Sequence, residues 1–127
     1  MARSMSLRGP DDAGVWADAE QGVTLAHARL AVLDLSTAGH QPMHSHCERY
    51  VIVYNGETYN AEELRAELGQ DRPWKGHSDT EVVLEGIAQW GVEETLARMN
   101  GMFGLAVWDR RERRLTVARD RIGIKPL

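Results

Sequence analysis

Tyr50-Val-Ile-Val-Tyr-Asn-Gly-Glu-Thr-Tyr-Asn-Ala-Glu-Glu63 joins a run of β-branched and aromatic residues to the beginning of a helix. Residues 50–54 are typical of a buried strand, which we expect to end at Asn55-Gly56. Asn60 can cap the following helix while Glu63 reaches back to its first turn, so residues 61–68 should be helical. The stretch therefore predicts a strand that leads directly into a helix, with Asn55 and Gly56 at the junction.

The rest of the chain indicates further strands and helices around this junction. Strand-forming residues occupy 15–17, 23–33, 102–108 and 115–118. Residues 34–48 indicate a long loop, Ser78-Asp-Thr-Glu81 opens a longer helix that Gly91 ends, and residues 93–99 form a short third helix. This order of strands, helices and strands predicts an α+β fold, with the helices on one side of a largely antiparallel sheet.

Length and composition describe one globular domain over residues 1–127. The chain carries 15 Lys and Arg against 19 Asp and Glu, a net charge of -4, and 43% of its residues are hydrophobic. About two thirds of the unfolded surface can be buried at this length, so the single Cys47 need not form a disulfide. Scattered basic residues argue against a nucleic-acid partner, and no apolar run approaches the roughly 20 residues of a membrane span. We expect a cytoplasmic protein with no membrane partner.

Asn55-Gly56 allows two interpretations. Asn-Gly is the strongest short signal for a hairpin turn, but the residues 57–60 that follow lead into a helix start rather than a pairing strand. At such a junction the Asn amide and the Gly N–H can instead stabilise an oxyanion during acyl transfer.

Arg29 and Asp79 are also candidate site residues, each with a simpler alternative. Arg29 interrupts an apolar strand, where a partly buried guanidinium needs a carboxylate or phosphate partner; the alternative is a strand face that is exposed to solvent. Asp79 either favours the N-terminus of its helix or pairs with an ammonium group. If both face one pocket, they can bind the two ends of an α-amino acid.

His40, His44 and His46 with Cys47 resemble a metal cluster, but their spacing matches no structural zinc pattern. We therefore expect no metal site and interpret these histidines as solvated loop side chains. Cys47 is expected to be an inert loop thiol rather than a nucleophile.

The sequence resembles the glutaminase domain of class II glutamine amidotransferases, in the branch of the glutamine-dependent asparagine synthetases. The matching motifs run in family order from residue 8 to the last residue. They are Arg8-Gly-Pro-Asp-Asp12, His27-Ala-Arg-Leu-Ala-Val-Leu-Asp-Leu-Ser36, Gly39-His-Gln-Pro-Met43, Tyr54-Asn-Gly-Glu-Thr-Tyr-Asn60, His77-Ser-Asp-Thr-Glu81, Asn100-Gly-Met-Phe103 and Ala118-Arg-Asp-Arg-Ile-Gly-Ile-Lys-Pro-Leu127.

The resemblance implies an N-terminal-nucleophile hydrolase fold, an αββα sandwich of antiparallel sheets. In that family an N-terminal Cys attacks the glutamine amide, and the released ammonia travels to a synthetase domain that uses ATP and Mg to amidate aspartate or another carboxylate. By motif, Arg29 would hold the glutamine α-carboxylate and Asp79 its α-ammonium, while Glu57 would contact the amino-acid end. Asn55 and Gly56 would form the oxyanion hole. No cofactor is implied for the glutaminase domain itself.

The sequence departs from the family pattern in three places. The Cys-Gly-Ile start with the first strand is absent, and so are the synthetase domain after Leu127 and the usual Ile at Thr58. We therefore expect a truncated, inactive domain whose unpaired sheet edge promotes self-association. The alternatives are a catalytically dead glutamine-binding or interaction module and a structural remnant without a ligand.

Overall fold

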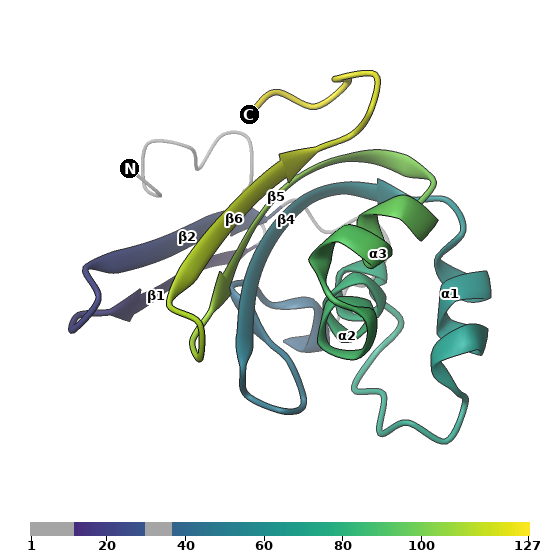
Figure 1. Ribbon diagram of the computed structural model, residues 1–127, viewed down its shortest axis with the longest axis horizontal. Coiled ribbons are helices and arrows are strands. Elements are labelled where there is room, and N and C mark those ends of the chain that lie inside the picture. The colour runs from purple at the N-terminus through teal and green to yellow at the C-terminus, as the bar shows by residue number, and fades with distance from the viewer. Residues whose placement is uncertain (1–11, 30–36) are drawn as a thin grey trace.

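The computed structural model describes residues 12–29 and 37–127, except for the side chain of Arg29. Two antiparallel sheets and three α-helices make up the described fold (Figure 1). One sheet pairs β1 (Asp12–Asp18) with β2 (Val23–Arg29), and the other has the order β3 (Met43–His44), β4 (Tyr50–Thr58), β5 (Gly101–Asp109) and β6 (Arg114–Arg119). The helices are α1 (Ala61–Leu68), α2 (Asp79–Trp90) and α3 (Val92–Arg98), and a 3₁₀ turn spans Thr37–Gly39.

The four-stranded sheet is covered by the helices on one face and by the β1–β2 sheet on the other (Figure 1). Side chains alternate between the two faces of a strand. In β4, Ile52 and Tyr54 belong to the core shared with the helices, whereas Val51 packs with Leu25 and Trp108 towards the β1–β2 sheet. The strand between 50 and 54 is therefore buried on both faces, as its continuous apolar run predicted.

Helix α2 lies at the centre of the helical layer and is buried along most of its length. Val83, Leu84 and Ile87 are fully inaccessible to solvent. Truncating one of these side chains to Ala costs about 2–5 kcal/mol through lost burial and the cavity left behind. The helix begins and ends as predicted, because Ser78 Oγ accepts a hydrogen bond from the Thr80 N–H and Gly91 follows with a φ of 86°. The first residue of α2, Asp79, is thereby held in a fixed place.

Strand β4 does not end at Asn55-Gly56 but continues to Thr58, so that prediction and the hairpin-turn interpretation are both wrong. Strand β5 pairs with it along its whole length, with Gly56 opposite Phe103. A Cβ at Gly56 would lie 2.1 Å from the Met102 carbonyl oxygen, so glycine permits close approach of the two backbones. Pairing with a distant strand has overridden the local turn preference.

The α1 start also differs in detail from its prediction. Its bounds agree, but the Asn60 side chain makes no capping hydrogen bond. Its Nδ2 donates to the Arg98 carbonyl and its Oδ1 accepts from the Asn100 N–H, both at 2.9 Å. Asn60 therefore joins the start of α1 to the turn between α3 and β5, a contact that no local motif encodes.

The α+β prediction with antiparallel sheets is confirmed. The described residues supply one helical layer and two sheets of the expected αββα sandwich, and the predicted strand residues 30–33 lie outside them. The short strand β3 falls in the segment expected to be a loop. Within residues 12–29 and 37–127, none of the helices has the length and apolarity needed to cross a membrane.

Candidate functional site

Asp79 meets the end of β4, which brings it next to the predicted residues Asn55, Gly56 and Glu57. The Thr58 N–H donates to Oδ2 of Asp79 at 2.8 Å. The helix start and the strand end are distant from each other in sequence, and their contact places a carboxylate beside the predicted oxyanion residues. Asn55 itself is exposed, and its side chain makes no hydrogen bond to another residue of the described ranges.

The Asp79 carboxyl is buried, with 7% of the residue exposed. Burial raises its pKa above the ordinary value, and the neighbouring charge of Glu57 raises it further, while hydrogen bonds from the Thr58 and Thr80 N–H groups oppose the shift. No Lys or Arg of the described residues forms an ion pair with Asp79. A desolvated carboxyl without a cation is suited to bind one from a ligand.

Two buried hydroxyl groups lie beside this carboxyl. The Tyr54 hydroxyl and Thr58 Oγ1 are 2.7 Å apart, and both residues are buried. Burial, followed by the charge of Asp79, raises the pKa of the Tyr54 hydroxyl, so it stays protonated. Thr58 thus binds Asp79 through its backbone and Tyr54 through its side chain, and the second of these contacts needs a hydroxyl that the usual Ile at this position lacks.

Three backbone N–H groups of β4 face the edge of the strand that β5 does not occupy. Residues two apart in a strand direct their N–H groups to the same edge. The Tyr54 N–H donates to Oε1 of Gln41 at 2.6 Å, and the Thr58 N–H is bound by Asp79. The Gly56 N–H lies between these two on the same edge.

The Gly56 N–H has no partner in the described part of the sheet. Phe103, opposite Gly56, directs its own backbone groups away from β4: its N–H donates to Asp120 Oδ2 at 3.1 Å, and its carbonyl accepts from the Asp120 N–H at 2.8 Å. This leaves the Gly56 N–H as an open donor between two occupied ones, beside the exposed Asn55 amide. Such a pair of donors can stabilise a developing oxyanion.

Arg29 ends β2, but its side chain lies outside the described part of the structure, so its meeting with Asp79 stays a prediction. The backbone of β2 does come close to the site. Nε2 of His27, in the same strand, donates to the Tyr54 carbonyl oxygen at 3.1 Å. The C-terminal part of β2 therefore lies beside β4 just before Asn55.

The histidines of the 40–46 segment have separate partners. His40 pairs with Asp12, His44 with Glu48, and His46 with Glu81 and Glu85. Within residues 12–29 and 37–127, no group of three or more His, Cys, Asp or Glu side chains is arranged to hold a metal ion. His46 is 17% exposed at its side chain, so the expectation of a solvated loop histidine is wrong for this residue.

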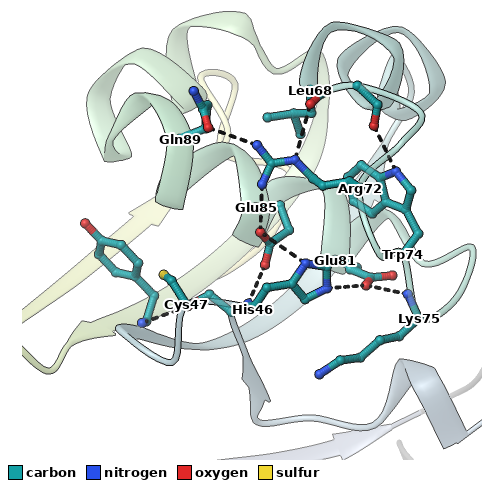
Figure 2. Close-up of polar contacts among 12 residues, drawn as sticks. His46, Cys47, Leu68, Arg72, Trp74, Lys75, Glu81, Glu85 and Gln89 are labelled. Atoms are coloured by element: carbon teal, nitrogen blue, oxygen red, sulfur yellow. Dashed lines mark hydrogen bonds and ion pairs between the residues drawn. The ribbon is translucent and has the colours of Figure 1, made fainter.

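His46 belongs to a buried polar cluster that the sequence analysis missed (Figure 2). Glu85 accepts from the His46 N–H at 2.8 Å and from Nη1 of Arg72 at 3.1 Å. Glu81 accepts from the backbone N–H groups of Lys75 and Gly76 at 2.8 and 3.1 Å. The spacing of Glu81 and Glu85, one helical turn apart on a helix with an apolar stripe, was the available signal.

This polar cluster stabilises the loops that lie next to the candidate site. Glu81 and Glu85 on α2 bind the loops that contain His46 and residues 72–76, and so hold in place the segment that leads into Asp79 (Figure 2). Glu81 also does not reach back to cap its own helix as the capping-box pattern predicted, because it is occupied by the 75–76 backbone.

Cys47 lies at the other end of β4 from the candidate site. It is exposed, and its Sγ is 3.3 Å from Ser45 Oγ. The strand rises about 3.3 Å per residue, so residues 50 and 55 alone are separated by roughly 16 Å. This thiol is not placed to attack a group bound at Asn55 and Gly56.

Comparisons with known proteins match the whole chain. A family model described as "Glutamine amidotransferase domain" matches residues 1–127. Asparagine synthetase [glutamine-hydrolyzing] 3 of Bacillus subtilis is 44% identical over 99% of the chain, and asparagine synthetase B [glutamine-hydrolyzing] of Escherichia coli is 38% identical over 100%. Amidase chry2 of Gibberella zeae is 38% identical over 94%. The chain spans about a fifth of the length of these relatives, 18–22%.

Proposed function

This chain belongs to the glutamine amidotransferase domain family, and we propose on that premise that it acts as the glutaminase part of a glutamine-hydrolysing synthetase. The reaction assigned to it is hydrolysis of the glutamine side-chain amide to glutamate and ammonia. The observation that supports this best is the open Gly56 N–H, which lies between the groups bound by Gln41 and Asp79 and beside the exposed Asn55 amide.

The substrate's amino-acid end would bind at Asp79, Arg29 and Glu57. The buried Asp79 carboxyl would accept hydrogen bonds from the α-ammonium group, and Arg29 would bind the α-carboxylate through its fixed fork of donors. Glu57 adds a second negative charge close to Asp79. Two carboxylates on one side of a ligand favour a cationic group there, which matches an α-ammonium.

The amide end of glutamine would then lie at Asn55 and Gly56. Attack on the amide carbon, which the resemblance assigns to the thiolate of an N-terminal Cys outside the given sequence, would place negative charge on the amide oxygen. The two N–H donors would stabilise that charge until the C–N bond breaks and ammonia leaves. We assign Cys47 no part in the attack, because it lies at the opposite end of β4.

The ammonia produced would be used by another part of the same protein. The relatives named asparagine synthetase are about five times longer than this chain. We propose that the remainder amidates aspartate with ATP and Mg, and that this chain contributes no residue to binding either. The described residues provide no metal-holding group for such a step.

The test is steady-state glutaminase kinetics in the complete gene product, with glutamate and asparagine measured separately. Asn55→Ala should lower kcat for glutamate release by about 10²–10³-fold with little change in KM, because it removes a transition-state donor. Arg29→Ala should chiefly raise KM. Asp71→Asn, an exposed change in the loop after α1, is the control.

Three results would contradict the proposal. Glutamine that binds without glutamate release identifies a glutamine-binding module, whereas no binding at all identifies a structural domain. Glutamate release that Cys47→Ser abolishes would contradict the assignment of the site to Asn55 and Gly56.

A further inference from the structure

The side chain of Gln41 behaves as a short piece of strand alongside β4. Its Oε1 accepts from the Tyr54 N–H at 2.6 Å, and its Nε2 donates to the Tyr54 carbonyl oxygen at 3.1 Å. One primary amide thus satisfies both backbone groups of Tyr54, as a neighbouring strand residue would. Gln41 is buried, with 6% of the residue exposed, so neither bond is replaced by water.

This contact occurs where the sheet lacks a strand. Strand β3 pairs with β4 only at Ile52 and Val51 and has ended before Tyr54 is reached. Without Gln41 the Tyr54 N–H would be buried and unpaired on this edge, which costs about 1–3 kcal/mol. The Tyr54 carbonyl would keep only the hydrogen bond from Nε2 of His27. The Gln41 amide therefore supplies the hydrogen bonds that a longer β3 would make to Tyr54.

Gln41 is itself held from two directions. Its Nε2 lies 3.3 Å from Thr80 Oγ1, in the first turn of α2 next to Asp79. Its backbone is packed against β1, since a Cβ at Gly14 would lie only 2.0 Å from the Gln41 carbonyl oxygen. Gln41 therefore contacts β1 through its backbone, and β4 and the N-terminus of α2 through its side chain.

We propose that Gln41 is a positioning residue that aims the Gly56 N–H into the oxyanion site, an inference that rests on the proposed function. Gln41 at Tyr54 and Asp79 at Thr58 restrain the strand on both sides of Gly56 at the same edge. The strand cannot then shift at Gly56, towards or away from this edge, without straining these bonds. Gln41 touches no reacting atom; it acts through the backbone of Tyr54.

The experiment compares Gln41→Met with Gln89→Met. Met keeps the approximate volume of Gln but makes neither bond to Tyr54. Gln89, an exposed residue near the end of α2, is the control: its Oε1 accepts from Nη2 of Arg72 at 2.9 Å rather than from β4, so its replacement also removes a side-chain amide hydrogen bond but not one to Tyr54. In the complete gene product, Gln41→Met should lower kcat for glutamate release by about 10- to 100-fold while KM changes by less than about 3-fold, because a small misplacement of a catalytic donor acts on the transition state. Gln89→Met should leave both constants unchanged.

A second measurement does not depend on activity. In the 127-residue chain, amide hydrogen exchange and NMR shifts at Tyr54 and Gly56 should change in Gln41→Met and not in Gln89→Met. Gln41→Glu retains the acceptor for the Tyr54 N–H but presents an oxygen to its carbonyl, and it should perturb the same two amides.

The outcomes separate this inference from the proposed function. If the wild-type protein releases no glutamate but the Gly56 amide still responds to Gln41→Met, the proposed function fails and the positioning contact stands. If wild type is active and Gln41→Met folds with unchanged kcat, or with KM raised in place of a lowered kcat, the positioning role is refuted. If neither Gln41 variant folds, Gln41 is a structural residue and the proposal is likewise overturned.

Discussion

Replacing Asp79 by Asn should stabilise the domain at neutral pH and weaken its binding of glutamine. The carboxyl is buried, and its pKa is raised from the ordinary 3.8, first by burial and then by the charge of Glu57. Asn retains an oxygen that can accept from the Thr58 N–H but carries no charge to desolvate. The same change removes the charge that would bind the substrate α-ammonium.

The sign of the pH dependence follows from the raised pKa. A carboxyl whose folded pKa lies above its unfolded value binds its proton more tightly in the folded state. That contribution to stability is fully present below pH 3.8 and is lost as the pH rises through the folded pKa. The stability of Asp79→Asn relative to wild type should therefore increase from acid to neutral pH. This gain is reduced by about 0.3–1 kcal/mol, because Asn lacks the negative charge that the N-terminus of the helix dipole stabilises.

The effect of Asp79→Asn on glutamine binding should be larger than its effect on stability. A charge-assisted hydrogen bond contributes about 1.5–3 kcal/mol, so the loss of Asp79 should weaken glutamine binding by roughly 10- to 150-fold. Calorimetric titration with glutamine measures this, and urea unfolding at several pH values measures stability. Glutaramic acid, which is glutamine without its α-ammonium group, should bind wild type and variant equally. Asp71→Asn is the matched control for an Asp-to-Asn change at an exposed position.

Two results would refute this reasoning. If Asp79→Asn is less stable than wild type by the same amount at every pH, the carboxyl is not destabilised by burial in the folded state. If glutamine and glutaramic acid lose affinity equally in the variant, Asp79 acts on the shape of the pocket and does not bind the ammonium group.

Three further predictions follow from single contacts. Gly56→Ala should lower the free energy of unfolding by at least about 2 kcal/mol, because its Cβ meets the Met102 carbonyl oxygen; an unchanged urea midpoint would contradict the close approach of β4 and β5. Glu85→Ala should cost about 3 kcal/mol in the same assay, since it removes the partner of the mostly buried Arg72, and a loss below 1 kcal/mol would show that solvent replaces it. In the complete gene product, Cys47→Ser should leave glutamate release unchanged, and any loss of activity would assign this exposed thiol a catalytic role.

The candidate site was only partly predictable from the sequence. The motif match predicted Asn55, Gly56 and Asp79 as candidate site residues, and the contact of Thr58 with Asp79 brings the end of β4 and the start of α2 together. The contact of Gln41 with β4 could not be predicted, because its amide binds the backbone of Tyr54, and a backbone partner does not depend on which residue occupies that position. The contact is needed because β3 pairs with β4 only at Val51 and Ile52, which leaves Tyr54 without a strand partner on this edge.

The sequence by itself determined the helices, the antiparallel α+β class and the family to which the chain belongs. Helix α2 begins at a Ser cap and ends at a glycine, both of which act within a few residues of the chain. Tertiary structure alone decided that β4 continues through Asn55 and Gly56, because the hydrogen bonds that extend it come from the distant β5. It also decided that, among residues 12–29 and 37–127, the Gly56 N–H remains open. Phe103, opposite Gly56, pairs with Asp120, and no local pattern predicts which edge of a strand a distant residue will occupy.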